Sequence, residues 1–378
     1  MKTKILQEKL NECLLNIERV VGKDTTLPIL NNILLKTEKN LLTLSATNLE
    51  TGVVWKILSK NEKDGNIALP AQAFANFINS LPNKSIEITV DGFLATISCE
   101  GRKSVFKGLA TDEFPALPIN TENEPLIINS KVFCESLSQV VSFTSISSIK
   151  PEITGVYLVI SKEFMKIVAT DSFRLGEKTL NLSSTEKTIK DARAIILPQR
   201  AVREIVALFG AYNKDIKIYF TPNQITIELM MEEIQQPKIQ FVTQLIEGEF
   251  PDYEAIIPTK SSLAAVFSKK EFINHIKSAS LFASKTNEVE LKISAKKGMI
   301  VIYGQSAELG EYEGEMKADS IEGEDTTISF NYKFLLDGLN VLDGDRCVLE
   351  LSNNDGPGLI KADQKPDFIY IVMPIKKD

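Results

Sequence analysis

The chain has 378 residues, of which 43% are hydrophobic and 25% are charged, and its net charge is −7. This is the composition of an ordinary globular protein that is long enough for two or three domains. The negative charge argues against a protein that grips nucleic acid through bulk positive charge, although it allows positive charge that is confined to one surface.

The cysteines and the start of the chain exclude several further classes. The four cysteines lie far apart and include no C-x-x-C pair, which argues against a zinc ribbon or a redox motif. The first ten residues carry charges throughout and lack the apolar region of a signal peptide. The sequence contains no run of 18 apolar residues, so it predicts no membrane-spanning helix. We therefore expect a cytoplasmic protein without a membrane partner.

In chain order, three helices with an apolar stripe are each followed by strand-like runs and a second helix. The stripes begin at Leu6, Phe133 and Phe272, and the first extends to Val21. The second helices are opened by turn signals at Pro70, Pro198 and Asn331, which are 128 and 133 residues apart. A period of this length is the size of a domain, so the sequence predicts three tandem copies of one module.

Alternating apolar and polar residues predict antiparallel hairpins between the helices. Such pairs of runs occur at 32–37 with 41–46, 85–90 with 94–98, 155–160 with 165–169, 216–220 with 224–229, and 289–293 with 299–303. Alternation indicates sheets with one buried face, which the amphipathic helices must cover. We expect an α+β fold with domains at 1–121, 122–258 and 259–378, with boundaries at the Pro-, Asn-, Thr- and Glu-rich stretch 118–125 and at the short polar stretch 258–262.

The sequence contains no set of residues that indicates catalysis. The single histidine, His275, lies inside a helical stripe, so a multi-histidine metal site is excluded. Neither a dinucleotide-binding nor a P-loop glycine pattern is present. We therefore expect a protein that is not an enzyme, with no cofactor, no metal and no catalytic residue.

Basic residues on the predicted helices allow two interpretations. They are either solvated helix faces or one common surface that collects the positive charge, with acidic residues concentrated elsewhere, as at 311–315 and 322–325. The sequence pattern alone leaves both open.

Four short motifs carry a resemblance to a known family. They are TLPIL at 26–30, ATDSFRL at 169–175, FPDY at 250–253 and VMP at 372–374. Their order and spacing, together with the threefold repeat, make the chain resemble the bacterial DNA polymerase III beta subunit, the replicative sliding clamp, along essentially its whole length.

The resemblance implies an architecture and a function. Three domains of antiparallel sheets, with two helices each, would form half of a ring, and a head-to-tail homodimer would close it. The ring would encircle double-stranded DNA topologically and without sequence preference. The protein would be a non-catalytic processivity factor of the DNA polymerase III holoenzyme.

The resemblance also implies a peptide-binding pocket between domains 2 and 3. Its residues would be Ile153, Thr170, Ser172, Arg174, Leu175, Pro251, Ile256, Val372, Met373, Pro374 and Ile375. The pocket would receive a leucine- and phenylalanine-containing peptide from the polymerase III alpha subunit, the clamp-loader delta subunit, other polymerases and repair proteins. Phe173 stands where the family often has His or Tyr.

Two further sets of residues follow from the resemblance. Lys23, Lys150 and Arg200 would face DNA, with Lys23 serving because the usual basic position holds Asp24. The dimer interface would use Phe106, Leu281 and Phe282. Two alternatives remain open: a repeat-built scaffold that binds proteins without encircling DNA, and an enzyme that acts on DNA ends.

Overall fold

The computed structural model describes residues 1–22, 27–182, 192–258, 260–283, 285–353, 355–365 and 367–376. The chain divides into two compact units. Unit 1 contains Met1–Glu135 and Arg200–Ile246, and unit 2 contains Ser136–Ser184, Asp191–Gln199 and Glu247–Asp378. Among the described residues no helix is long and apolar enough to span a membrane.

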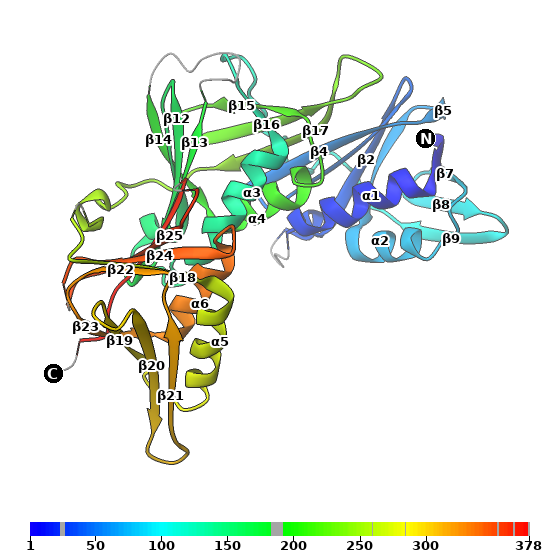
Figure 1. Cartoon of the computed structure of the whole chain (residues 1–378). Coiled ribbons are helices and arrows are strands. Elements are labelled where there is room, and N and C mark those ends of the chain that lie inside the picture. The colour runs from blue at the N-terminus through cyan, green and yellow to red at the C-terminus, as the bar shows by residue number, and fades with distance from the viewer. Residues whose placement is uncertain are drawn as a thin grey trace. The chain divides into compact units, whose positions relative to one another are not determined.

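The same order of elements occurs three times along the chain (Figure 1). The first repeat contains β1 (Lys2–Leu6), α1 (Gln7–Ile17), β2 (Asn32–Glu38), β3 (Leu41–Thr47), β4 (Thr51–Leu58), the short β5 (Lys60–Lys63), β6 (Gly65–Pro70), α2 (Ala71–Asn79), β7 (Ser85–Asp91), β8 (Leu94–Cys99) and β9 (Arg102–Lys107).

The second and third repeats follow the same plan. The second contains β10 (Leu126–Asn129), α3 (Ser130–Val140), β11 (Gly155–Ile160), β12 (Phe164–Thr170), β13 (Arg174–Asn181), β14 (Arg193–Pro198), α4 (Gln199–Phe209), β15 (Asp215–Phe220), β16 (Gln224–Met230) and β17 (Pro237–Gln244). The third contains β18 (Leu263–Ser268), α5 (Lys269–Ser280), β19 (Glu288–Ser294), β20 (Met299–Ser306), β21 (Gly310–Lys317), the short β22 (Ser320–Gly323), β23 (Thr326–Asn331), α6 (Tyr332–Val341), β24 (Arg346–Leu351), β25 (Gly358–Ala362) and β26 (Phe368–Val372). Short 3₁₀ turns lie at Glu18–Val20, Pro28–Asn31, Val141–Phe143, Pro151–Ile153 and Glu254–Ile256.

The second helix of each repeat begins where the sequence predicts. Pro70 and Pro198 immediately precede α2 and α4, and Asn331 caps α6 by accepting a hydrogen bond from the Lys333 amide at 3.0 Å. The predicted extent of the first helix is wrong at both ends. Leu6 is 56% exposed at the end of β1, and α1 ends before Val21, because the chain tightens into a 3₁₀ turn there.

Each unit holds two antiparallel sheets. In unit 1 the strand orders are β5-β1-β7-β8-β9 and β10-β15-β16-β17-β4-β3-β2-β6. In unit 2 they are β14-β11-β12-β13-β26-β25-β24-β18-β22 and β21-β20-β19-β23. Helices cover their buried faces: α1 packs against α2 in unit 1, and α5 packs against α6 and β21 in unit 2 (Figure 1). The expected α+β class is confirmed.

Neighbouring repeats share a sheet. In unit 1, β4 of the first repeat pairs with β17 of the second, with Trp55 opposite Ile239. In unit 2, β13 of the second repeat pairs with β26 of the third, with Arg174 opposite Val372. The corresponding strands at the two ends of the series, β9 and β21, therefore lie at the edges of their sheets.

Candidate partner-docking site

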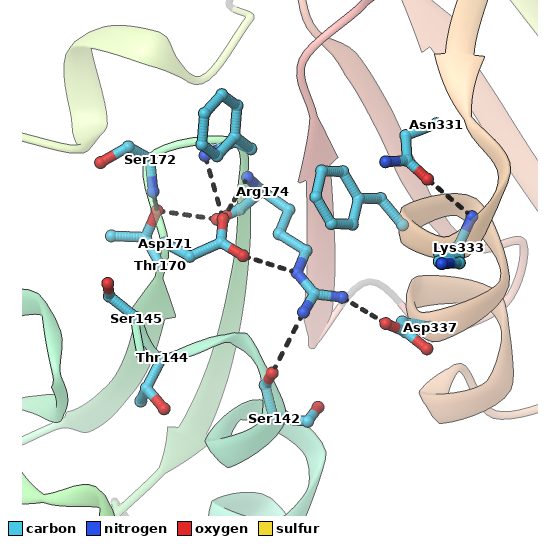
Figure 2. Close-up of polar contacts among 12 residues, drawn as sticks. Ser142, Thr144, Ser145, Thr170, Asp171, Ser172, Arg174, Asn331, Lys333 and Asp337 are labelled. Carbon is cyan, nitrogen blue, oxygen red and sulfur yellow. Dashed lines mark hydrogen bonds and ion pairs between the residues drawn. The ribbon is translucent and has the colours of Figure 1, made fainter. Parts of the chain in front are cut away.

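All eleven residues of the predicted pocket belong to unit 2, and the turn between β12 and β13 is the best defined part (Figure 2). The Thr170 hydroxyl donates to the Arg174 carbonyl at 2.7 Å and accepts from the Ser172 amide at 3.1 Å. One Asp171 carboxylate oxygen accepts from the amides of Phe173 and Arg174, both at 3.0 Å. Ser172 has a φ of +76°, a left-handed conformation that these bonds stabilise.

The side chain of Arg174 is held by polar groups from three segments. Its Nε donates to Asp171 Oδ2 at 2.9 Å, and its Nη1 pairs with the Asp337 carboxylate of α6 (Figure 2). Nη2 donates to the Ser142 carbonyl at 3.4 Å. Charge-assisted bonds to two carboxylates fix the plane of the guanidinium group.

Two aromatic rings complete the surroundings of Arg174. Its guanidinium carbon lies 5.4 Å from the centre of the Phe143 ring and 4.7 Å from that of Phe334. The Phe334 ring also stacks on Phe173, which is 61% exposed. Phe143, Phe334 and Asp337 are not predicted from the sequence, because only the fold brings the 3₁₀ turn Val141–Phe143 and helix α6 to this turn.

The floor below this turn is a hydrophobic cluster. Leu175 is fully buried with Val168, Tyr253 and Ile371. Phe250 and Ile257, which flank Pro251 and Ile256 in the chain, pack against the cluster. Leu175 is thus a core residue, whereas Ile256 is 41% exposed and free to contact a partner.

The C-terminal segment runs beside the turn. Val372 pairs with Arg174 across the two strands and is fully buried. The Met373 amide donates to the Phe173 carbonyl at 2.8 Å, and the Ile375 amide donates to the Ser329 carbonyl at 2.8 Å. Met373, Pro374 and Ile375 are half-buried, so their side chains are partly accessible.

The remaining predicted pocket residues differ in exposure. Ile153, at the end of the 3₁₀ turn Pro151–Ile153, is buried, while Ser172 and Pro251 are exposed. The structure therefore brings Thr170, Arg174, Leu175 and Met373 together around one strand pair, with buried and accessible members. Their role in binding a peptide stays a prediction.

The predicted DNA-facing residues lie in both units. Lys23, with Asp24, is outside the described residues. Lys150 is exposed just before the 3₁₀ turn at 151, and Arg200 on α4 donates to the Arg19 carbonyl at 3.5 Å. On the same helix as Arg200, burial raises the pKa of Glu204, and the charges of Arg19 and Arg200 only partly oppose this.

The predicted dimer residues lie at sheet edges or next to one. Phe106 is on β9 and contacts Phe74 and Phe77 of α2, with ring centres 6.0 and 5.7 Å away. Leu281, just after α5, is 69% exposed. Phe282 stacks on Tyr312 of β21 at 6.5 Å.

Comparisons with known proteins cover the chain in three consecutive parts. Family models of the DNA polymerase III beta subunit match as its N-terminal domain at residues 1–118, its central domain at 127–252 and its C-terminal domain at 254–376. Within the described residues no three His, Cys, Asp or Glu side chains gather as they would around a metal ion.

Similar proteins and structures agree with these matches. The beta sliding clamp of Streptococcus pneumoniae serotype 4 is 27% identical over 369 residues, 95% of each chain, and that of Staphylococcus aureus is 25% identical over 95% of this chain and 94% of its own. The crystal structure of the Bacillus subtilis sliding clamp superposes with a TM-score of 0.93 over 100% of both chains at 25% identity. The beta chain structure from Streptococcus pneumoniae gives 0.90 at 27% identity, also over both whole chains. The chain therefore belongs to the DNA polymerase III beta subunit family, the sliding clamps that serve DNA replication as non-catalytic processivity factors.

Proposed function

We propose that this chain forms a head-to-tail homodimer, a closed ring around duplex DNA that tethers polymerases through the site at β13 and β26. The observation that carries this proposal is the pair of sheet edges, β9 and β21. In the first two repeats the third strand after the first helix, β4 or β13, extends the sheet of the next repeat. β21 has that position in the third repeat, and β9 has the position of β17 and β26.

Pairing of β21 with β9 of a second copy would repeat the same arrangement across two chains. The two edges are different surfaces, so the contact is heterologous, and such contacts give a closed ring when the rotation is right. Two chains with three repeats each would supply six similar modules.

The charges on the two edges support this pairing. On β9 the Phe106 side chain faces α2, so the alternate, exposed residues face away from the helices: Lys103, Val105 and Lys107. On β21 the Tyr312 side chain faces His275 of α5, and the exposed alternate residues are Glu311, Glu313 and Glu315. If β9 and β21 paired in one continuous sheet, the sides of the two strands that face away from the helices would lie on the same face of that sheet. The lysines of β9 would then lie beside the glutamates of β21.

The apolar residues beside these edges suit the same contact. Phe106 and the stacked pair of Phe282 and Tyr312 lie on the helix side of their edges, and Leu281 is exposed next to Phe282. They would supply the apolar part of an interface whose rim is charged.

Binding to DNA would be topological in this proposal. Lys23, Lys150 and Arg200 would contact phosphates, which carry no sequence information, so the ring could move along any duplex. Few such contacts and a net charge of −7 suit a protein that must slide. We place the protein in the cytoplasm, with three clamp domains at 1–121, 122–258 and 259–378.

The docking site would take a peptide from the polymerase III alpha subunit, the clamp-loader delta subunit, other polymerases or repair proteins. The exposed ring of Phe173 and the partly accessible Met373 offer apolar surface to leucine and phenylalanine side chains. Methionine adapts to apolar ligands of different shape.

Retention on circular DNA tests the proposal. The protein is assembled on a nicked plasmid with a bacterial clamp loader and ATP, separated from free protein by gel filtration, and the plasmid is then linearised. We expect co-elution with the circle and release after linearisation. Equal loss from both forms, with peptide binding intact, would instead favour a scaffold that never encircles DNA.

A further inference from the structure

Unit 1 contains a groove that the proposed function does not use. A cavity of about 320 Å³ lies where β4 and β17 meet the start of α1 and the chain after α4. It adjoins a second hollow of about 550 Å³, and both are lined by Leu6 and Leu58. These volumes lie in the range of ligand-binding clefts.

A polar network forms the floor of the groove. Glu12 Oε1 accepts from the Tyr212 hydroxyl at 2.8 Å and from Lys238 Nζ at 3.1 Å, and Nζ also donates to the Tyr212 oxygen at 2.8 Å. Burial acts to raise the pKa of Glu12, but the Tyr212 hydrogen bond and the Lys238 charge outweigh it, so the pKa lies below its ordinary value. Glu12 therefore stays ionised and holds Lys238 in place at neutral pH.

Lys238 is held over aromatic rings with one N–H to spare. Its Nζ lies 4.7 Å from the centre of the Tyr212 ring and 5.4 Å from that of Trp55. An ammonium group has three donors, and the two oxygens of Glu12 Oε1 and Tyr212 use two of them. The third can serve an acceptor on a ligand.

The rim combines exposed leucines with lysine side chains. Leu6 is 56% and Leu58 39% exposed where the two hollows adjoin. Lys9 and Lys56 line the smaller cavity, which holds the network. The charge of Lys9 also acts to lower the pKa of Glu12, but among the described residues neither lysine lies within ion-pair distance of a carboxylate. An apolar strip between these lysines matches a segment in which apolar and acidic residues alternate.

We propose that this groove binds an extended acidic and apolar peptide segment of a partner protein. Leucine-like side chains would cover Leu6 and Leu58, while carboxylates would reach Lys9, Lys56 and the spare N–H of Lys238. Glu232 on the same lining is ion-paired with Lys214. A nucleic acid fits less well, because the apolar walls of the groove offer a phosphate chain nothing to bind.

The chain's single tryptophan reports on this groove directly, because Trp55 lines it. The free protein is titrated with acetyl-Glu-Leu-Glu-Leu-Glu-amide while Trp55 emission is followed, with the Gln-for-Glu and Lys-for-Glu peptides as controls. We expect a saturable change with the Glu peptide, with a Kd below about 1 mM, and none with the Lys peptide. A short DNA duplex serves as the competing probe.

Matched variants make the result specific. Lys56→Glu and Lys9→Glu should each lower the affinity for the Glu peptide at least about tenfold. Lys39→Glu, in the exposed turn between β2 and β3, should leave this affinity unchanged. Any of four results overturns the proposal: the Trp55 signal does not saturate, the Gln peptide binds as tightly as the Glu peptide, Lys56→Glu leaves the affinity unchanged, or the DNA duplex displaces the peptide. Because free protein is used, failure of ring closure leaves this result unaffected.

Discussion

The guanidinium group of Arg174 lies 4.7 Å from the centre of the Phe334 ring, so a strand of the second repeat is held against a helix of the third. The same group forms ion pairs with Asp171 and with Asp337 of α6. We expect this contact to stabilise unit 2 as well as to shape the docking site.

Removal of either partner should show the coupling. Arg174→Ala and Asp337→Ala should each lower the free energy of unfolding. The loss in the double variant should be smaller than the sum of the two single losses by about 1 kcal/mol. This difference is modest because Asp337 is half-exposed, which weakens its ion pair with Arg174. Urea unfolding of the four proteins measures this. Strict additivity would show that the ion pair contributes nothing to stability.

Leu175→Ala and Met373→Ala should separate folding from peptide binding. Leu175 is fully buried, so its truncation should cost about 2–5 kcal/mol of unfolding free energy. Met373 is only half-buried, and its truncation should weaken a Leu-Phe peptide several-fold with little loss of stability. Thermal melting and fluorescence anisotropy give the two readouts. Unchanged peptide affinity in Met373→Ala would contradict the assigned site.

Charge reversal at the sheet edges should control the dimer. Lys103→Glu with Lys107→Glu should weaken the dimer by roughly tenfold or more, since like charges would then face each other, and Glu311→Lys with Glu315→Lys should do the same. A mixture of the two variants should form heterodimers, because the reversed β9 then faces the reversed β21 at one interface and the unchanged strands face each other at the other. Sedimentation velocity measures all three. If the affinity of the dimer is unchanged by both charge reversals, the dimer interface does not use these strands.

Glu204→Gln should change how stability depends on pH. Burial raises the pKa of Glu204, so the fold favours its protonated form; that stabilisation is complete below the ordinary value of 4.5 and is lost as pH rises through the raised pKa. The neutral glutamine keeps it, so the variant should be more stable at pH 7.5, by about 1.4 kcal/mol for each unit of the shift, and equal to the parent protein near pH 4. Urea unfolding at three pH values, with the exposed Glu113→Gln as control, tests this. A constant difference at all pH values would show that Glu204 is ionised without cost.

The repeat could be predicted from the sequence because it depends on local patterns. The apolar stripes of α1, α3 and α5 repeat with the period of a helix, and the hairpin strands alternate apolar and polar residues. Both patterns can be read within short windows of sequence, because they show which side chains are buried. The strands that join repeats were not predicted. β21, with the sequence GEYEGEMK, has little apolar alternation of its own, and its role depends on position in the sheet order. Leu175 showed the same limit, since its motif suggested a pocket wall and only packing with Tyr253 and Ile371 shows a core residue.

The sharing of sheets between repeats has a consequence for how the chain melts. The second repeat contributes β10 and β15 to β17 to unit 1, and β11 to β14 to unit 2. The units that unfold cooperatively should therefore follow the sheets and not the repeats. A fragment cut at the repeat boundaries would expose two unpaired strand edges at each cut. Heat absorption should divide into transitions that each draw on residues from two repeats, and Trp55 emission should follow only the transition of unit 1.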